Sequence, residues 1–146
     1  MRKIVFAFTA LLFTLISGAQ TEVKVMSFNI RLDVKSDGAN WWENRKDKVA
    51  GLMKYYGADF IGGQEVQHHQ LLYLKEQLSS YNHIGVGRDD GKEKGEYSCI
   101  FYNKEKFVPV KQGTFWLSQT PDTVSMGWDA VCNRVCTWGL FRLGKT

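Results

Sequence analysis

The alternation of apolar and polar stretches predicts strands and helices in turn over the first half of the chain. Two apolar runs that contain Val, Phe and Ile are predicted strands, over residues 23–30 and 59–66. Two segments with apolar residues at helical spacing are predicted helices, over residues 42–56 and 68–78, with Gly57 as the stop of the first. The polar stretches 31–40 and 87–95 are predicted loops.

After residue 80 the pattern changes to strands alone. Further apolar stretches predict strands over residues 83–86, 97–102, 107–113 and 131–143. Early strands that alternate with helices, followed by strands alone, favour an α/β fold with a mixed sheet and helices on its outer face. The last predicted strand lies close to the end of the sequence, and we expect it to be an edge that invites a partner strand.

The first nineteen residues are predicted to be a secretory signal peptide. Arg2 and Lys3 form a charged start, residues 4–16 are an apolar run, and the small residues 17–19 suit cleavage before Gln20. The run is shorter than the roughly 20 apolar residues that a membrane span needs. We therefore expect no membrane span and an exported protein, periplasmic or secreted, whose domain occupies residues 20–146.

Composition and charge narrow the classes of partner. The 146 residues are 44% hydrophobic and 23% charged with two prolines, which excludes a disordered chain. Nineteen Lys and Arg against fifteen Asp and Glu give a net charge of +4, and removal of the two leader cations leaves 17 − 15 = +2. This balance indicates no extended basic footprint for nucleic acid or an anionic membrane.

The cysteines and histidines predict neither a disulfide nor a zinc site. Cys132 and Cys136 fall in one predicted strand, where their Cα atoms would lie roughly 13 Å apart at ~3.3 Å per residue. A disulfide spans at most ~7 Å between Cα atoms, and the preferred interpretation is buried free thiols. His68 and His69 are adjacent and His83 stands apart, so no set has zinc-ligand spacing.

Two polar residues follow the early apolar strands. Glu65 lies near the end of the strand 59–66, and Asn29 near the end of the strand 23–30. Open α/β sheets bind ligands at the carboxyl ends of their strands. A carboxylate there suits Mg²⁺, which takes one or two carboxylates with water and phosphate oxygens, and an amide can donate to phosphate. Taken alone, Glu65 is equally consistent with a surface glutamate, and a turn residue is the favoured interpretation of Asn29. The two residues at neighbouring strand ends make a stronger case than either one.

Several segments resemble one protein family in the order in which they occur. These segments are Ser27-Phe28-Asn29-Ile30-Arg31, Gln64-Glu65-Val66, residues 95–102, residues 114–118, Thr120-Pro121, residues 127–130, Arg134 and Thr137-Trp138. Together they resemble the endonuclease/exonuclease/phosphatase superfamily, which includes DNase I, and the later ones resemble a secreted bacterial branch of it. The resemblance covers nearly the whole of residues 20–146. It implies the amino-terminal half of a four-layer α/β sandwich, with a mixed sheet and outer helices.

The same resemblance implies metal-dependent hydrolysis of phosphoesters, with Mg²⁺ or Mn²⁺ as cofactor. It implies that Glu65 and Asn29 form the metal side of the site and that Asn29 also positions phosphate and the attacking water. Arg134 would contact the phosphate, and Glu96 would sit at the site and orient a histidine. A structural ion pair for Arg134 and a hairpin surface position for Glu96 are the alternatives.

The resemblance also touches three residues of the later motifs. Trp116, Trp128 and Asp129 could shape a substrate pocket. Core packing is the favoured interpretation for the two tryptophans, and stabilisation of its own loop is the alternative for Asp129.

The resemblance further implies a second half, with a Gly-Asp-x-Asn segment and a late Asp-His pair that these 146 residues do not contain. The interpretation we favour is a phosphoesterase that is incomplete here. A non-catalytic phosphate-binding module and a non-functional fragment are the alternatives. The substrate class stays open among nucleic acid, phospholipid, phosphoinositide and sugar phosphate, and no oligomeric state is predicted. We expect the isolated chain to be inactive and to leave five apolar side chains partly facing water, namely Phe28, Ile100, Tyr102, Val135 and Trp138.

Overall fold

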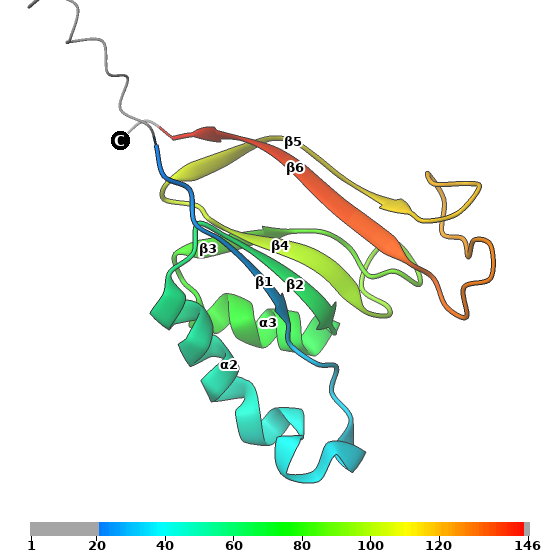
Figure 1. The fold of residues 1–146 in the computed structure, drawn as a ribbon, viewed down its shortest axis with the longest axis horizontal. Helices are drawn as coiled ribbons and strands as arrows, with labels where there is room; N and C mark the ends of the chain where they lie inside the picture. Colours follow the sequence, from blue (N-terminus) through cyan, green and yellow to red (C-terminus); the bar gives the residue numbers. More distant parts are fainter. Residues whose placement is uncertain (1–20, 145–146) are drawn as a thin grey trace, which may run out of the picture.

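A computed structural model of the chain describes residues 21–144, so the predicted signal peptide lies outside the described residues. Its elements form three layers: two helices, a four-stranded sheet and a two-stranded hairpin (Figure 1). The sheet consists of β1 (Val25–Asn29), β2 (Phe60–Val66), β3 (Tyr81–Ile84) and β4 (Tyr97–Asn103). The helices are α2 (Trp42–Tyr56) and α3 (His68–Gln77), preceded by the short 3₁₀ helix η1 (Lys35–Asn40), and the hairpin consists of β5 (Phe107–Trp116) and β6 (Val135–Leu143).

The four-stranded sheet is mixed, which confirms the predicted fold class. Its strand order is β1-β2-β4-β3, with β1 parallel to β2 and the other neighbours antiparallel. Asn29 is in register with Gln64 at the ends of the parallel pair. Because parallel strands end at the same edge of a sheet, the residues that follow β1 and β2 meet there.

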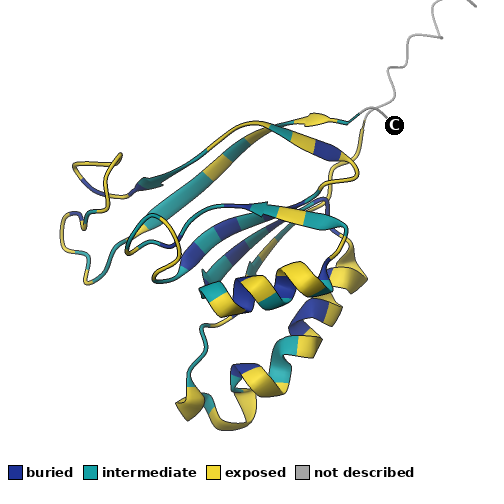
Figure 2. Cartoon of the chain, turned by 180° about the vertical axis from the view of Figure 1, so that it is seen from behind, coloured by how far each residue is buried: buried dark blue, intermediate teal, exposed yellow. Residues whose placement is uncertain are grey.

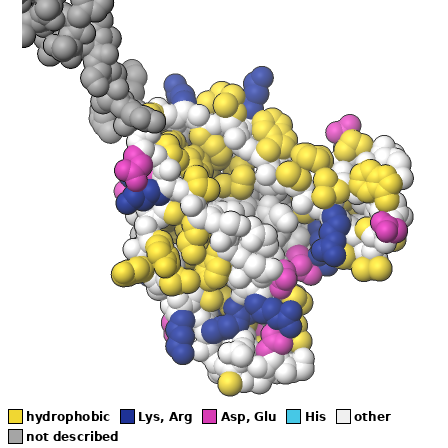
Figure 3. Space-filling model, viewed as in Figure 1, with side chains coloured by type: hydrophobic (Ala, Val, Ile, Leu, Met, Phe, Trp, Pro, Cys, Tyr) yellow, Lys and Arg dark blue, Asp and Glu magenta, His cyan; other side chains and the backbone are white. Residues whose placement is uncertain are grey.

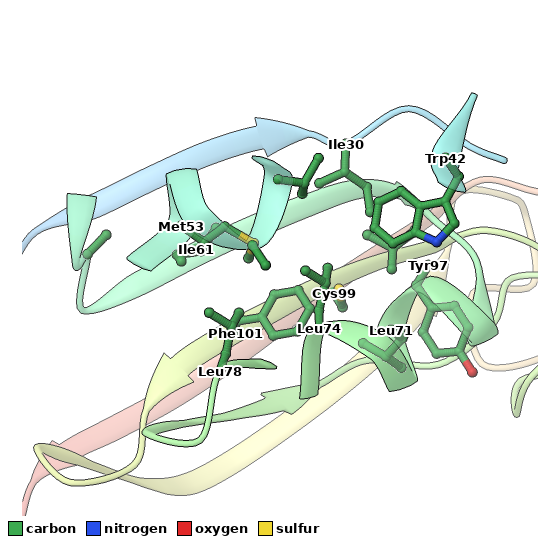
Figure 4. Close-up of a cluster of buried hydrophobic side chains, with 14 residues drawn as sticks. Ile30, Trp42, Met53, Ile61, Leu71, Leu74, Leu78, Tyr97, Cys99 and Phe101 are labelled. Atoms are coloured by element: carbon green, nitrogen blue, oxygen red, sulfur yellow. The ribbon is translucent and has the colours of Figure 1, made fainter. Parts of the chain in front are cut away.

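The main core lies between the helices and the sheet. Trp42, Val49, Ala50 and Met53 of α2 are buried, and Gly57 ends this helix in the left-handed conformation with φ 53°. Figure 4 shows Trp42 and Met53 in one cluster with strand residues such as Ile61 and Phe101, both at most 1% exposed. The buried faces of the helices therefore point toward the sheet, and their outer faces are exposed (Figure 2).

A second, smaller cluster lies between the sheet and the hairpin. The ring of Phe60 lies 4.6 Å from that of Phe107 and 4.8 Å from that of Phe141. Tyr102, 5% exposed, packs against Phe141 at 5.0 Å. The hairpin thus supplies an opposing sheet for this face of β2 and β4.

This second cluster corrects the expectation for one of the five apolar side chains predicted to face water in part, Tyr102, whereas the other four are partly or fully exposed as expected. Tyr102 is buried under the hairpin, whereas Phe28 is partly buried against the core on the helix side. Ile100 is partly buried against the hairpin cluster, and Val135 is also partly buried. Of the five, only Trp138 is exposed, at 45%.

The predicted strand over 131–143 is too long at its start. Strand β6 begins at Val135, and residues 131–134 belong to the long loop that connects it to β5. The loop closes at its base, where the Leu117 N–H donates to the Arg134 carbonyl at 2.8 Å. Cys132 therefore lies in a loop rather than in a strand with Cys136, and all three cysteines are free.

Candidate functional site

The predicted pair Asn29 and Glu65 is in direct contact where β1 and β2 end. The Asn29 Nδ2 donates to Glu65 Oε1 at 2.7 Å. The other carboxylate oxygen accepts from the Leu32 N–H at 3.2 Å, and Asn29 Oδ1 accepts from the Arg31 N–H at 2.8 Å. Asn29 thus holds Glu65 with its amide nitrogen, and one of its own oxygen lone pairs is already used.

A break in the regular strand turns Glu65 toward this contact. The register between β2 and β4 shifts between Gly63 and Val66, which marks a bulge. Within it, Glu65 has φ 57°, and Arg31 after β1 has φ 63°. Both residues are in the left-handed region, which a non-glycine residue occupies at an energetic cost and which is over-represented at functional sites.

The surroundings of Glu65 favour its charged form. The hydrogen bond from Asn29 is the largest effect and lowers the pKa of the Glu65 carboxyl below its ordinary value, whereas partial burial acts in the opposite direction. The Leu32 N–H and the guanidinium groups of Arg31 and Arg45 lower this pKa further. An ionised carboxylate at this position is what cation binding requires.

A cleft of about 240 Å³ brings the four predicted site residues together. Asn29, Glu65, Glu96 and Arg134 all line it, although they come from four separate stretches of the chain. Arg134 is the last residue of the long loop that projects from the hairpin (Figure 1), and basic and acidic side chains meet at the neck of this loop (Figure 3). The arrangement places carboxylates and a guanidinium around one space, as a cation and an anionic ligand would require.

The cleft contains a residue that the sequence patterns missed. Arg88 also lines it, and Arg88 Nη2 lies 2.8 Å from Glu96 Oε1. Its side chain is only 16% exposed, although it falls in the predicted polar loop 87–95. The available signal was its position two residues after the predicted strand 83–86, with Glu96 eight residues later on the returning stretch.

The two tryptophans of the later motifs have opposite environments. Trp116 is 6% exposed, as the core interpretation expects, and its Nε1 donates to the Arg88 carbonyl at 2.7 Å. Trp128 is 72% exposed with φ 51°, so the core interpretation is wrong for this residue. Its loop position explains the exposure. Asp129 is exposed beside it, and neither Trp128 nor Asp129 lines the cleft.

None of the histidines of residues 21–144 lines the cleft. His68 contacts the Tyr97 hydroxyl at 3.0 Å, His69 contacts Asp33 at 2.9 Å, and His83 packs beside Phe101. No group of three or more His, Cys, Asp or Glu side chains in this range is placed to hold a metal ion. The helices of the same range are also too short or too polar to cross a membrane.

The donor set of the cleft nevertheless fits Mg²⁺ or Mn²⁺. Such ions are held in many enzymes by one or two carboxylates, with water and substrate phosphate completing the shell. The cleft offers the carboxylate of Glu65, beside Glu96 that is paired with Arg88, and a guanidinium, Arg134, that suits phosphate. Clusters of three or more acidic or imidazole ligands are typical of other kinds of metal centre.

Comparison with solved structures gives extensive matches. The chain is 47% identical to the endonuclease/exonuclease/phosphatase from Bacteroides vulgatus, with a TM-score of 0.83, over 85% of this chain and 48% of that protein. It is 48% identical to a mannosyl-6-phosphatase of Bacteroides thetaiotaomicron, with a TM-score of 0.81, over 84% of this chain and 46% of that protein. The chain therefore spans about half the length of these solved proteins.

Comparison of sequences alone finds a more distant match. An uncharacterized protein of Acanthamoeba polyphaga mimivirus is 30% identical over 91 residues, which are 60% of this chain and 34% of that protein. No protein-family model matches the sequence.

Proposed function

Since the chain has the fold and sequence of part of an endonuclease/exonuclease/phosphatase domain, we propose that it forms the cation and phosphate side of a divalent-metal-dependent phosphoester hydrolase. Its bacterial relatives in this family include a phosphatase, so hydrolysis of a phosphoester is the coarse function that the kinship supports. The dependence on Mg²⁺ or Mn²⁺ and the roles of single residues are our proposal.

The observation that carries the proposal is the shared cleft. Four residues chosen from sequence motifs lie around one space of about 240 Å³. Side chains selected only for packing or for solubility have no reason to converge in this way from separate stretches of the chain. Convergence of carboxylates and a guanidinium on one pocket is typical of an active site.

Each residue has a chemical role in the proposal. Glu65 binds the cation, and Asn29 holds its carboxylate and presents its remaining acceptor capacity to water or phosphate. Arg134 makes no ion pair within the described range and is exposed at the cleft, so it is available to contact the phosphate. A bound cation would offset the negative charge that builds on phosphate during hydrolysis.

We further propose a sugar phosphate as the substrate. The support is the mannosyl-6-phosphatase of Bacteroides thetaiotaomicron, 48% identical over 84% of this chain. A net charge of +2 without the leader also suits a small anion better than a long polynucleotide.

Cleavage before Gln20 and export are likewise proposed, and sequencing the amino terminus of the protein recovered from its source cells tests them.

The decisive experiment measures hydrolysis by the complete gene product, with any residues that continue this sequence. Mannose 6-phosphate and bis(4-nitrophenyl) phosphate are compared with Mg²⁺, with Mn²⁺ and with excess EDTA. We expect release of phosphate from the monoester with either metal and none with EDTA. Glu65→Gln should lower kcat/KM by about a hundredfold or more, because the variant loses the anionic ligand of the cation.

Two matched variants sharpen the interpretation. Arg134→Ala should also lose about a hundredfold, because it removes a charged contact to the reacting phosphate, whereas Arg142→Ala on the exposed face of β6 should stay near wild type. Undiminished hydrolysis in EDTA, or full activity of Glu65→Gln, would refute the metal-dependent mechanism. Phosphate binding without turnover would favour a phosphate-binding module instead.

A further inference from the structure

The backbone of Arg88 is fixed in the cleft wall by contacts on several sides. The Arg88 N–H donates to the Glu96 carbonyl at 3.2 Å, and the Arg88 carbonyl accepts from Trp116 Nε1 at 2.7 Å. The next residue, Asp89, accepts from Asn133 Nδ2 at 3.2 Å. Arg88 is thus held between the stretch that carries Glu96 and the loop end that carries Arg134.

The side chain of Arg88 is committed to Glu96. Arg88 Nη2 lies 2.8 Å from Glu96 Oε1, and the two side chains are 16% and 21% exposed. The Arg88 Nε is buried without a hydrogen-bond partner in the described part of the chain, and at 3.8 Å it is too far from Asp89 Oδ1 to bond. Because its Nε is buried, Arg88 is poorly placed to bind a ligand from solvent, but it is well placed to hold the Glu96 carboxylate.

The charges of the cleft explain why Glu96 needs to be held. Glu65 and Glu96 line the same space, and an unpaired Glu96 would be a second carboxylate open to the cation that Glu65 binds. Glu65 is occupied by Asn29 and the Leu32 N–H, whereas the partner of Glu96 is Arg88. The ion pair neutralises one carboxylate of the two and fixes where its oxygens point.

We propose that Arg88 is a positioning residue for Glu96. Its guanidinium keeps the Glu96 carboxylate from binding the cation, so that Glu65 alone binds the cation. The same ion pair keeps Glu96 oriented for the reaction. This inference rests on the proposed function. It implies an unusual pair of effects, because loss of Arg88 should tighten cation binding while it slows turnover. A variant that merely folds badly would lose both.

The test is Mn²⁺ binding by the complete gene product, measured from the EPR signal of free Mn²⁺. Arg88→Gln and Arg134→Gln remove the same charge from the same cleft, so a difference between them does not come from net charge. We expect Arg88→Gln to bind Mn²⁺ about fivefold more tightly than Arg134→Gln, because a freed carboxylate at contact distance adds at least that much attraction. Adding Glu96→Gln should abolish the excess, and Arg88→Lys should restore most of the wild-type behaviour.

A second measurement, which does not depend on metal binding, tests whether Arg88 holds the Glu96 carboxylate in place. With ¹³C-labelled glutamate, the Glu96 carboxyl signal, assigned from Glu96→Gln, should move in Arg88→Gln and stay in place in Arg134→Gln. An unmoved Glu96 signal in Arg88→Gln, or equal Mn²⁺ affinities of Arg88→Gln and Arg134→Gln, would overturn the positioning role. Failure of wild type and every variant to bind Mn²⁺ would instead refute the proposed metal site, and the Glu96 signal would then decide the role of Arg88.

Discussion

At the scale of single residues, Glu65 combines an unfavourable backbone with a well-bonded side chain. Its φ of 57° lies in the left-handed region, while its carboxylate accepts hydrogen bonds from Asn29 and from the Leu32 N–H. A residue selected for stability alone would be glycine here, because glycine adopts this conformation without steric cost. The glutamate is therefore better explained by its chemistry than by the needs of the fold.

Two substitutions at this position separate backbone from side chain. Glu65→Gly and Glu65→Ala both delete the carboxylate and its hydrogen bonds, but only glycine relieves the strain. We expect the glycine variant to be more stable than the alanine variant by about 1 kcal/mol. Urea unfolding of the two proteins measures this difference, and an alanine variant that is equally or more stable would show that the backbone is not strained.

The pKa of Glu65 gives a prediction in pH. The hydrogen bond from Asn29 is the largest cause of its lowered pKa, so Asn29→Ala should raise that pKa toward its ordinary value. Wild type should then keep Mn²⁺ to a lower pH than the variant, because the charged form persists further into acid.

The same shift has a consequence for stability. A lowered folded-state pKa stabilises the folded protein above the unfolded-state pKa, and the contribution is lost as the pH falls through the folded-state value. Mn²⁺ binding measured between pH 3 and 6 tests the lowered pKa of Glu65, with substitution of the exposed Asn82 of β3, Asn82→Ala, as control. Coincident curves for wild type and Asn29→Ala would contradict the role of Asn29.

At the scale of elements, the connection between β3 and β4 is an ordered part of the site. Its backbone closes on itself, with the Gly87 N–H bonded to the Lys92 carbonyl at 3.0 Å and the Asp89 N–H to the Lys94 carbonyl at 3.0 Å. Polarity alone predicted a loop here and did so correctly. The ion pair between Arg88 and Glu96 joins the two sides of this loop, and no periodicity of apolar residues reports such a contact.

A glycine substitution tests how much the cleft depends on this connection. A Cβ at Gly87 would lie 2.3 Å from the Lys94 carbonyl oxygen, a backbone atom that cannot move alone. Gly87→Ala should destabilise the protein by about 1–3 kcal/mol and displace Arg88 and Glu96. Gly51→Ala on α2 has open space around it and should stabilise by about 0.5–1 kcal/mol. Equal unfolding midpoints for the two variants would contradict this picture.

Sequence patterns located the early elements better than the late ones for a physical reason. Residues of β1, β2, α2 and α3 are packed on one core, so their apolar spacing reflects burial directly. The segment before β6 contains Val131, which is 90% exposed, and Trp128, which is 72% exposed. Apolar residues in an exposed loop imitate a strand, which is why the predicted strand began too early.

At the scale of the whole molecule, the hairpin covers the sheet but is itself uncovered. Phe107 and Phe141 face the sheet, so the alternate positions Val108, Trp138 and Leu140 lie on the outer face of the hairpin. They are 38%, 45% and 53% exposed. Figure 3 shows hydrophobic side chains clustered on the part of the surface that the hairpin forms. An apolar sheet face of this kind is normally covered by another layer.

This exposure predicts the behaviour of residues 20–146 expressed alone. We expect this segment to aggregate and to show no phosphoesterase activity, because its hairpin presents an apolar face and an edge strand. Light scattering and an assay with Mn²⁺ and mannose 6-phosphate measure both properties. Trp138→Lys with Leu140→Lys should raise the soluble fraction, whereas Lys111→Arg, on the same hairpin, should not. A monodisperse, active segment would contradict the expectation.

The central claim is that Glu65 binds a divalent cation in the cleft that Arg134 shares. Anomalous diffraction from crystals of the complete gene product soaked in Mn²⁺ tests it most directly. We expect an anomalous peak within coordination distance of the Glu65 carboxylate in wild type and no peak there in Glu65→Gln. A wild-type peak only at another site, or a peak that persists unchanged in Glu65→Gln, would contradict it.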